Sequence, residues 1–146
     1  MSLSQETVTA VKKTIPLVGK NAEKITTRMY EILFDKYPET KPLFANAQGD
    51  QHKKLAGAIA AFAANIDNLG ALSAAVEKMA TTHVLTKVKP EHYPMVADAL
   101  ITAMGDVLGE DFTDEYKQAW IEAYTFLANI LMQREKELYS QQKQLN

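Results

Sequence analysis

The sequence contains no cysteine, and this absence removes several chemical classes at once. Without a thiol the chain cannot carry a disulfide framework, a thiolate nucleophile or an iron–sulfur cluster. A cysteine-free chain also fits a reducing compartment, and the first six residues are polar, without the apolar centre of a signal peptide. We therefore expect the protein in the cytoplasm.

Long apolar runs and an excess of one charge are also missing. The longest candidate span, 55–66, is rich in alanine and too short to cross a bilayer, so no membrane insertion is expected. The 16 Lys and Arg residues against 18 Asp and Glu residues leave a net charge of -2, which predicts no nucleic-acid partner. The length of 146 residues suits one domain covering 1–146.

Helical periodicity dominates what remains, because β-branched residues are scattered and never alternate for long. We predict six long helices, joined by a short helical turn at 38–44 and by polar loops. They cover approximately 4–19, 21–37, 51–69, 72–83, 90–108 and the chain from 113 onward. Pro16 predicts a kink or an end in the first of them, and Gly109 predicts the end of the fifth.

An all-α chain of this length fits either a helical bundle or the globin fold. The helices are uneven in length, and Pro38, Pro42 and Pro90 interrupt the chain. Both features favour the irregular globin arrangement over an up-and-down bundle.

Segments in a fixed order along nearly the whole chain resemble one known family. They are Thr14-Ile15-Pro16-Leu17, Tyr37-Pro38-Glu39, Pro42-Leu43-Phe44, Ala64 to Leu69, Ala75 to Lys78 with His83, Lys89 to Tyr93, Ala119-Trp120 with Tyr124, and Arg134 to Tyr139. The set resembles the globin domain of bacterial flavohaemoglobins and the related single-domain haemoglobins of the Vitreoscilla type. This resemblance implies a globin fold around a pocket for haem b.

His83 is the residue on which the resemblance depends most. On spacing alone, a helix histidine of this kind is more often a partly buried side chain with one hydrogen bond. The resemblance implies instead that His83 is the protein ligand of the haem iron. His52 and His92 are poorer candidates, since we expect His52 to point away from the pocket and His92 to lie near the surface.

The resemblance also implies that Tyr93 and Glu137 orient His83. A carboxylate that accepts a hydrogen bond from the iron-bound histidine gives it imidazolate character, which favours activation of the O–O bond. From the residues alone, Tyr93 could equally be a core tyrosine. Composition favours an exposed charge for Glu137, because it lies in a helix end rich in Glu and Lys.

On the opposite side of the expected haem, the resemblance places Tyr30 and Gln51 as hydrogen-bonding residues beside the gas ligand. It places Leu55 as the apolar side chain that crowds this ligand, and Phe44 as the ring stacked on the haem. Core packing for Tyr30 and a solvated side chain for Gln51 remain alternatives. Three further haem contacts are expected at Val88, Val96 and Tyr124.

The resemblance implies a haem protein that reversibly binds O2, and also NO and CO, for oxygen binding or delivery. The alternative is an enzyme, a nitric oxide dioxygenase that converts NO to nitrate. This reaction would need a separate flavin reductase, because no GxGxxG run or other flavin- or nicotinamide-binding region follows the globin region. A cofactor-free helical interaction module is a third reading, and the chain could also be the globin part of a longer flavohaemoglobin.

Overall fold

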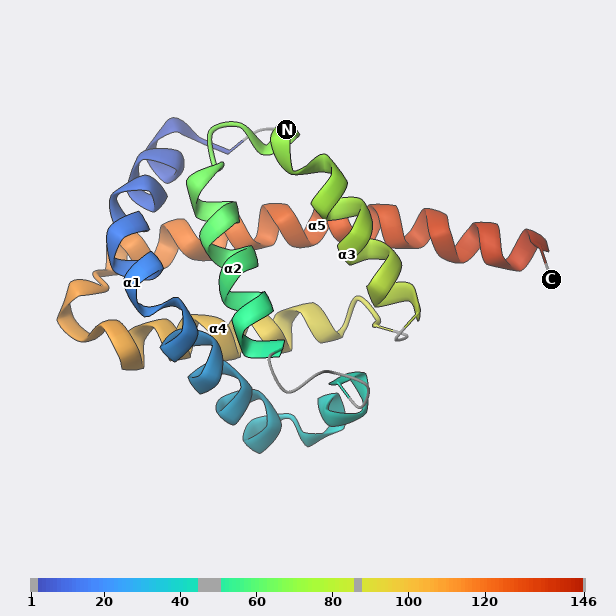
Figure 1. The fold of residues 1–146 in the computed structure, drawn as a ribbon, viewed down its shortest axis with the longest axis horizontal. Helices are drawn as coiled ribbons and strands as arrows, with labels where there is room; N and C mark the ends of the chain where they lie inside the picture. Colours follow the sequence, from blue (N-terminus) through green and yellow to red (C-terminus); the bar gives the residue numbers. More distant parts are fainter. Residues whose placement is uncertain (1–2, 45–50, 86–87, 146) are drawn as a thin grey trace.

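The computed structural model describes residues 3–44, 51–85 and 88–145, and these residues form an all-helical domain without strands (Figure 1). Five α-helices alternate with short 3-10 segments. In chain order they are α1 (Gln5–Lys36), η1 (Pro38–Phe44), α2 (Gln51–Ala64), η2 (Leu69–Leu72), α3 (Ser73–Leu85), α4 (His92–Leu108), η3 (Gly109–Asp111) and α5 (Asp114–Leu145).

Helix α1 continues across Pro16, which corrects the expectation of separate helices at 4–19 and 21–37. The described residues therefore hold five long helices rather than six. Proline removes one backbone hydrogen bond and costs about 3 kcal/mol within a helix. Fully burying a Val or Ile side chain stabilises by roughly 1.5–3 kcal/mol, and Val11 and Ile25, on either side of Pro16, are both completely buried. Their packing offsets the cost, and Figure 1 shows the helix changing direction instead of ending.

Helix α2 ends at Ala64, earlier than the expected end at Leu69. The backbone N–H of Asn65 is shared between the carbonyls of Ala61 and Phe62, at 3.0 and 3.3 Å. The side-chain amide of Asn65 also donates to the Ala61 carbonyl, at 2.8 Å. Because asparagine competes in this way for backbone partners, the last turn tightens and the α-helix stops.

Two other helix ends agree with the sequence signals. Helix α4 ends at Leu108, and Gly109 follows with a φ of 60°, a left-handed conformation that glycine adopts without a steric penalty. Thr113 then accepts a hydrogen bond from the backbone N–H of Tyr116 at 3.3 Å, and α5 begins at Asp114. The predicted boundary at 113 is therefore confirmed.

The main hydrophobic core lies where α1 packs on α4, α2 and α5. Its largest fully buried hydrophobic side chains are Trp120, Ile25, Met29, Leu33 and Met104. The indole N–H of Trp120 donates to the hydroxyl of Thr14 at 2.9 Å, so this buried polar group is satisfied. This contact joins α5 to α1 two residues before Pro16.

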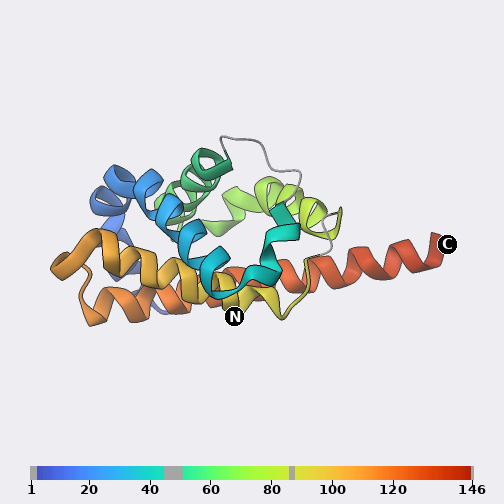
Figure 2. The ribbon, with the colours of Figure 1, turned by 90° about the horizontal axis from the view of Figure 1, so that it is seen from below.

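Helix α3 packs mainly against α5 and η2 among the described residues, and not against the main core. A second, smaller cluster forms at this contact from Ala80, Tyr93, Ala128 and Leu131. Figures 1 and 2 both show the last turns of α5 projecting past the other elements. The position of α3 therefore depends chiefly on α5.

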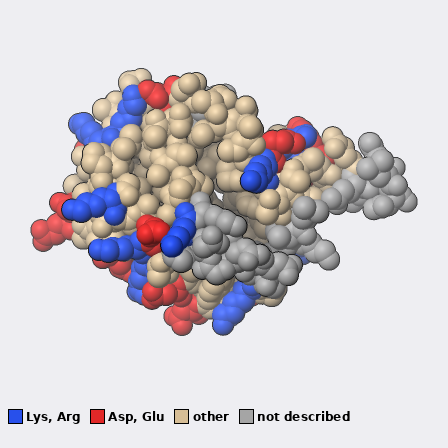
Figure 3. Space-filling model, in the orientation of Figure 1, with Lys and Arg blue, Asp and Glu red and all other residues tan. Residues whose placement is uncertain are grey.

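Charged side chains of both signs are interspersed over the face in Figure 3. Within the described residues, we find no helix with both the length and the apolar character needed to span a membrane.

Candidate functional site

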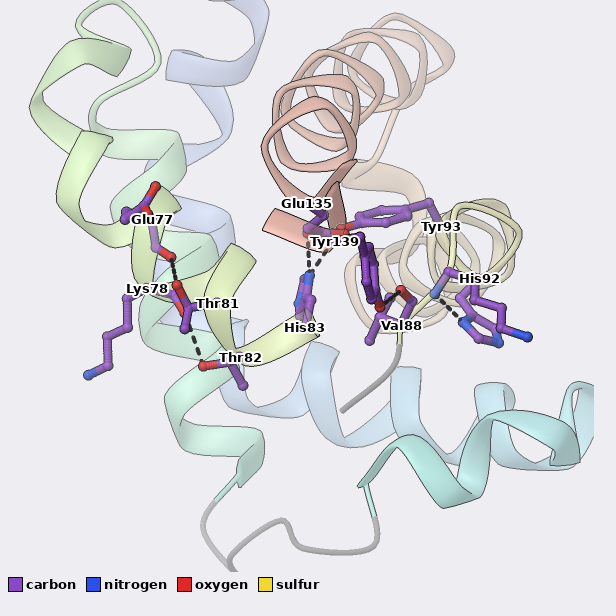
Figure 4. Close-up of polar contacts among 11 residues, drawn as sticks. Glu77, Lys78, Thr81, Thr82, His83, Val88, His92, Tyr93, Glu135 and Tyr139 are labelled. Carbon is purple, nitrogen blue, oxygen red and sulfur yellow. Dashed lines mark hydrogen bonds and ion pairs between the residues drawn. The ribbon is translucent and has the colours of Figure 1, made fainter. Parts of the chain in front are cut away.

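His83 lies in the last turn of α3, on the face that meets α5. Ala80, one turn earlier, is completely buried in the small cluster with Leu131 of α5. The His83 side chain is 30% exposed, so one part of the ring is enclosed and another part is accessible. Figure 4 shows the ring directed toward Glu135 on α5.

Two side chains, from two other helices, meet this ring. The Nδ1 atom of His83 lies 2.9 Å from Oε2 of Glu135 and 3.0 Å from the hydroxyl oxygen of Tyr93 (Figure 4). The hydroxyl of Tyr93 donates to the same Oε2 atom at 2.5 Å. We call these residues, His83 on α3, Tyr93 on α4 and Glu135 on α5, the histidine triad.

The hydrogen-bond pattern of the histidine triad determines the tautomer of His83. The phenol of Tyr93 has a single proton, and this proton is donated to Glu135. An ionised carboxylate can only accept, so Nδ1 of His83 must carry the proton that it shares with Glu135. The remaining nitrogen, Nε2, then has the lone pair that a metal ion requires.

Glu135 and Tyr93 of the histidine triad are buried, so the folded protein needs the hydrogen bonds of their polar groups. Glu135 is only 4% exposed and Tyr93 only 7%. A buried carboxylate is stable only with donors around it, and here it has two. Burial, followed by the hydrogen bond to the Glu135 carboxylate, raises the pKa of Tyr93 well above its ordinary value, so the phenol keeps the proton that it donates.

Two more tyrosines fix the backbone around the histidine triad. The hydroxyl of Tyr124 donates to the carbonyl of Tyr93 at 3.1 Å. The hydroxyl of Tyr139 donates to the carbonyl of Val88 at 3.0 Å, and the N–H of Val88 donates to the carbonyl of His83 at 2.9 Å. Helix α5 therefore holds the backbone at two places, at Val88 before α4 and at Tyr93 in the first turn of α4.

Glu137, predicted from the sequence to contact His83, does not do so, and this is a correction. Its side chain is 50% exposed and pairs with Arg134 of its own helix at 2.9 Å. Successive residues of an α-helix are separated by about 100°, so Glu135 and Glu137 point in directions roughly 200° apart. Only Glu135 faces His83, and the exposed surface charge that composition favoured for Glu137 is what the structure shows.

A signal for Glu135 is present in the sequence. Leu131 and Glu135 lie four positions apart, as do Glu135 and Tyr139, so all three share one side of α5. Leu131 is buried and Tyr139 is partly buried. Continuing the apolar stripe of α5 toward its end would have selected Glu135, whereas Glu137 lies off that stripe.

On the other side of the expected haem, the structure describes one of the four predicted side chains. Tyr30 lies on α1, partly buried against the main core, with its ring stacked on Phe34 at a centroid distance of 5.7 Å. The predicted contacts Phe44, Gln51 and Leu55 have side chains outside the described part of the structure. The role of Tyr30 stays a prediction.

The three remaining predicted contacts are divided between the two clusters. Val88 packs on the small cluster beside the histidine triad, Val96 packs on the main core, and Tyr124 contacts both. Burial, and then the charge of Glu135, raise the pKa of Tyr124 above its usual range. Tyr124 therefore links the main core to the site through its ring and its hydroxyl.

A cavity of about 650 Å3 lies between α5 and the first turns of α3, whereas His83 lies in the last turn of α3. Leu72, Val76 and Leu127 are among its lining residues, and His83, Tyr93 and Glu135 are not. The hydrogen-bond geometry, and not this cavity, identifies the candidate site.

The donor set at His83 fits a haem. Residues 3–44, 51–85 and 88–145 contain no group of three or more His, Cys, Asp or Glu side chains arranged to hold a metal. A haem iron already has four nitrogen ligands and needs one side chain from the protein. A single histidine whose Nδ1 donates to a carboxylate meets that need.

Haem proteins of the globin type hold the iron with one histidine of an all-helical domain, and this fold with His83 has the features of that class. The sequence model of the globin family matches residues 27–131. The chain belongs to the globin family.

Relatives of known sequence include both single-domain and longer proteins. A globin-like protein of uncharacterized function from Aquifex aeolicus is 50% identical over 139 residues, which are 95% of this chain and 99% of that protein. A flavohemoprotein from Rhodopirellula baltica is 48% identical over 143 residues, covering 96% of this chain but only 35% of the relative. The chain thus spans about a third of the flavohemoproteins that it matches.

A solved structure supports the fold. It is a protein of Rhodothermus marinus, classed provisionally as a nitric oxide dioxygenase and engineered as a carbene transferase. It is 40% identical with a TM-score of 0.91, covering 95% of this chain and 97% of the other. The predicted globin fold is confirmed, and haem-based binding of small gas molecules is the function that the family supports.

Proposed function

We propose that His83 is the iron ligand of a haem b and that the protein reversibly binds O2, NO and CO in the cytoplasm. The observation that carries this proposal is the hydrogen bond from Nδ1 of His83 to the buried carboxylate of Glu135. When bound, a haem would supply an iron centre that can take a diatomic gas as a ligand. Nε2 of His83 would hold that iron.

The other two members of the histidine triad act through His83. Glu135 accepts the hydrogen bond from Nδ1–H of His83, and this would increase the electron donation of the ring to a bound iron. Tyr93 holds the carboxylate in place by its own hydrogen bond. On the gas side, Tyr30 would donate a hydrogen bond to the ligand, with Gln51 and Leu55 beside it and Phe44 against the haem.

A nitric oxide dioxygenase is the second candidate, and the same hydrogen bond favours it. Strong electron donation from an imidazolate-like histidine promotes activation of O2 over simple storage. Such an enzyme would need an electron donor after each turnover. A separate flavin reductase would supply these electrons, and the flavohemoprotein relatives support this kind of partner.

Spectroscopy followed by kinetics tests both candidates. Purified protein given haem should develop an intense Soret band that shifts with O2 and with CO, and His83→Ala should lose the histidine-ligated spectrum. A wild-type protein that takes up no haem would end both proposals. NO consumption sustained by NADH and an added flavin reductase would identify the enzyme, whereas stable O2 binding without such turnover would identify the carrier.

A further inference from the structure

An ion pair joins α3 to α5 close to the histidine triad. One of its residues is the sequence neighbour of Glu135, but neither residue takes part in the hydrogen bonds of the triad. Arg134 of α5 donates from Nε to one carboxylate oxygen of Glu77 at 2.7 Å, and from Nη2 to the other at 2.8 Å. This is the two-bond geometry that fixes both the distance and the orientation of the two groups. Most surface ion pairs contribute little, and a bidentate arginine is the recognised exception.

The placement of this pair relates it to His83 and Glu135. Arg134 directly precedes Glu135 on α5, and Glu77 lies on α3, the helix that carries His83. The pair and the histidine triad therefore connect the same two helices. Any rotation or sliding of α3 against α5 that breaks the pair would also change the distance from His83 to Glu135.

Packing between α5 and the first turns of α3 is incomplete, which increases the importance of the ion pair. Val76 and Glu77 of α3, and Leu127, Ile130 and Arg134 of α5, all line the cavity of about 650 Å3. Ile130 is 38% exposed. Where a cavity separates two helices, apolar contacts restrict their motion less than in a filled core.

We propose that Glu77 and Arg134 are positioning residues that hold α3 in register with α5 and so maintain the hydrogen bond between His83 and Glu135. The proposal rests on the proposed function only in taking His83 as the iron ligand. The ion pair touches neither His83 nor the haem site, and it acts by fixing the helix on which the histidine stands.

The chain provides a closely matched control for this proposal. Arg134 binds a second carboxylate, Glu137, which lies on its own helix. Glu77 and Glu137 are 49% and 50% exposed, so replacing either by glutamine removes one equally exposed charge from the same arginine. Only Glu77→Gln weakens the connection to α3.

The primary measurement is the iron–histidine stretching band in the resonance Raman spectrum of the ferrous haem protein. Glu77→Gln should shift this band to lower frequency and broaden it, while Glu137→Gln leaves it at the wild-type position. Arg134→Lys, which keeps the charge but loses the two-bond fork, should shift the band in the same direction as Glu77→Gln. Equal band positions in the wild type and Glu77→Gln would overturn the proposal, as would an unchanged band in Arg134→Lys.

A second measurement separates this proposal from the haem assignment. Before haem is added, long-range 1H–15N spectra at alkaline pH report which ring nitrogen of His83 carries the proton. Glu77→Gln should reduce the Nδ1–H population, and Glu137→Gln should not. If the protein bound no haem, the proposed function would fail, while this comparison would still support or overturn the positioning role.

Discussion

The hydroxyl of Tyr93 donates to the carboxylate of Glu135 at 2.5 Å, across 42 positions of the chain and between two helices. This hydrogen bond leaves Nδ1 of His83 as the other donor to the same oxygen. A buried carboxylate with two donors thus determines which nitrogen of His83 faces the protein. The predictions below test the site and the fold that supports it.

Removing the negative charge at Glu135 should alter the electronic properties of the haem iron. Glu135→Gln weakens electron donation through His83, so the ferric/ferrous midpoint potential should rise by about 60 mV or more, which corresponds to a tenfold change in the equilibrium. Spectroelectrochemistry measures the potential. Glu137→Gln is the control and should stay at the wild-type value, because Glu137 faces away from His83. A larger shift at residue 137 than at residue 135 would contradict our assignment.

Replacing Tyr93 by phenylalanine should destabilise the protein and change its response to high pH. Loss of one donor to a buried carboxylate costs roughly 1–3 kcal/mol in free energy of unfolding, measurable by urea denaturation. Because the folded-state pKa of Tyr93 is raised, its contribution to stability is complete below the unfolded tyrosine pKa of about 10 and is lost as pH rises beyond it. Tyr93→Phe should therefore reduce the loss of stability above that pH. If the free energy of unfolding fell with the same slope above about pH 10 in the wild type and in the variant, the pKa of Tyr93 would not be raised in the folded protein.

Replacing Tyr30 by phenylalanine should accelerate release of O2 at least several-fold. A hydrogen bond to a partly charged ligand contributes about 1.5–3 kcal/mol, or about tenfold in rate and more. Stopped-flow displacement of O2 by CO measures the dissociation rate. Tyr37→Phe, at the residue that follows α1, is the control, since the hydroxyl of Tyr37 donates to Asp98 at 2.9 Å. An unchanged rate in Tyr30→Phe would place its hydroxyl outside the ligand pocket.

The hydrogen bond between Trp120 and Thr14 should be necessary for full stability. Thr14→Val keeps the shape of the side chain but leaves the buried indole N–H without its acceptor, which costs about 1–3 kcal/mol. Thermal or urea unfolding measures the loss. Thr125→Val removes an exposed hydroxyl that bonds only within its own helix, so its effect should be smaller. Equal stability of the two variants would contradict the importance of the buried contact.

The local features of the fold could be predicted from the sequence because they depend on neighbouring residues. Apolar periodicity located the long helices, and Gly109 and Thr113 located their ends. The two errors arose where a local signal had two possible outcomes. Pro16 could kink or end a helix, and only the burial of side chains on both sides decided for a kink. Asn65 ended α2 early by hydrogen bonds that its sequence position did not reveal.

His83 and Tyr93 followed from the sequence and its resemblance to a known family, and the structure places them within hydrogen-bond distance of each other. The choice between Glu135 and Glu137 required the tertiary structure. His83 and Glu135 are 52 positions apart, so their contact depends on how α5 is rotated about its axis against α3. That rotation is set by packing of Ala80, Leu131 and their neighbours. The sequence by itself determined the helices that carry His83 and the glutamates, and its resemblance to a known family implied that one glutamate of the last helix contacts His83. The packing of two helices decided which glutamate does so.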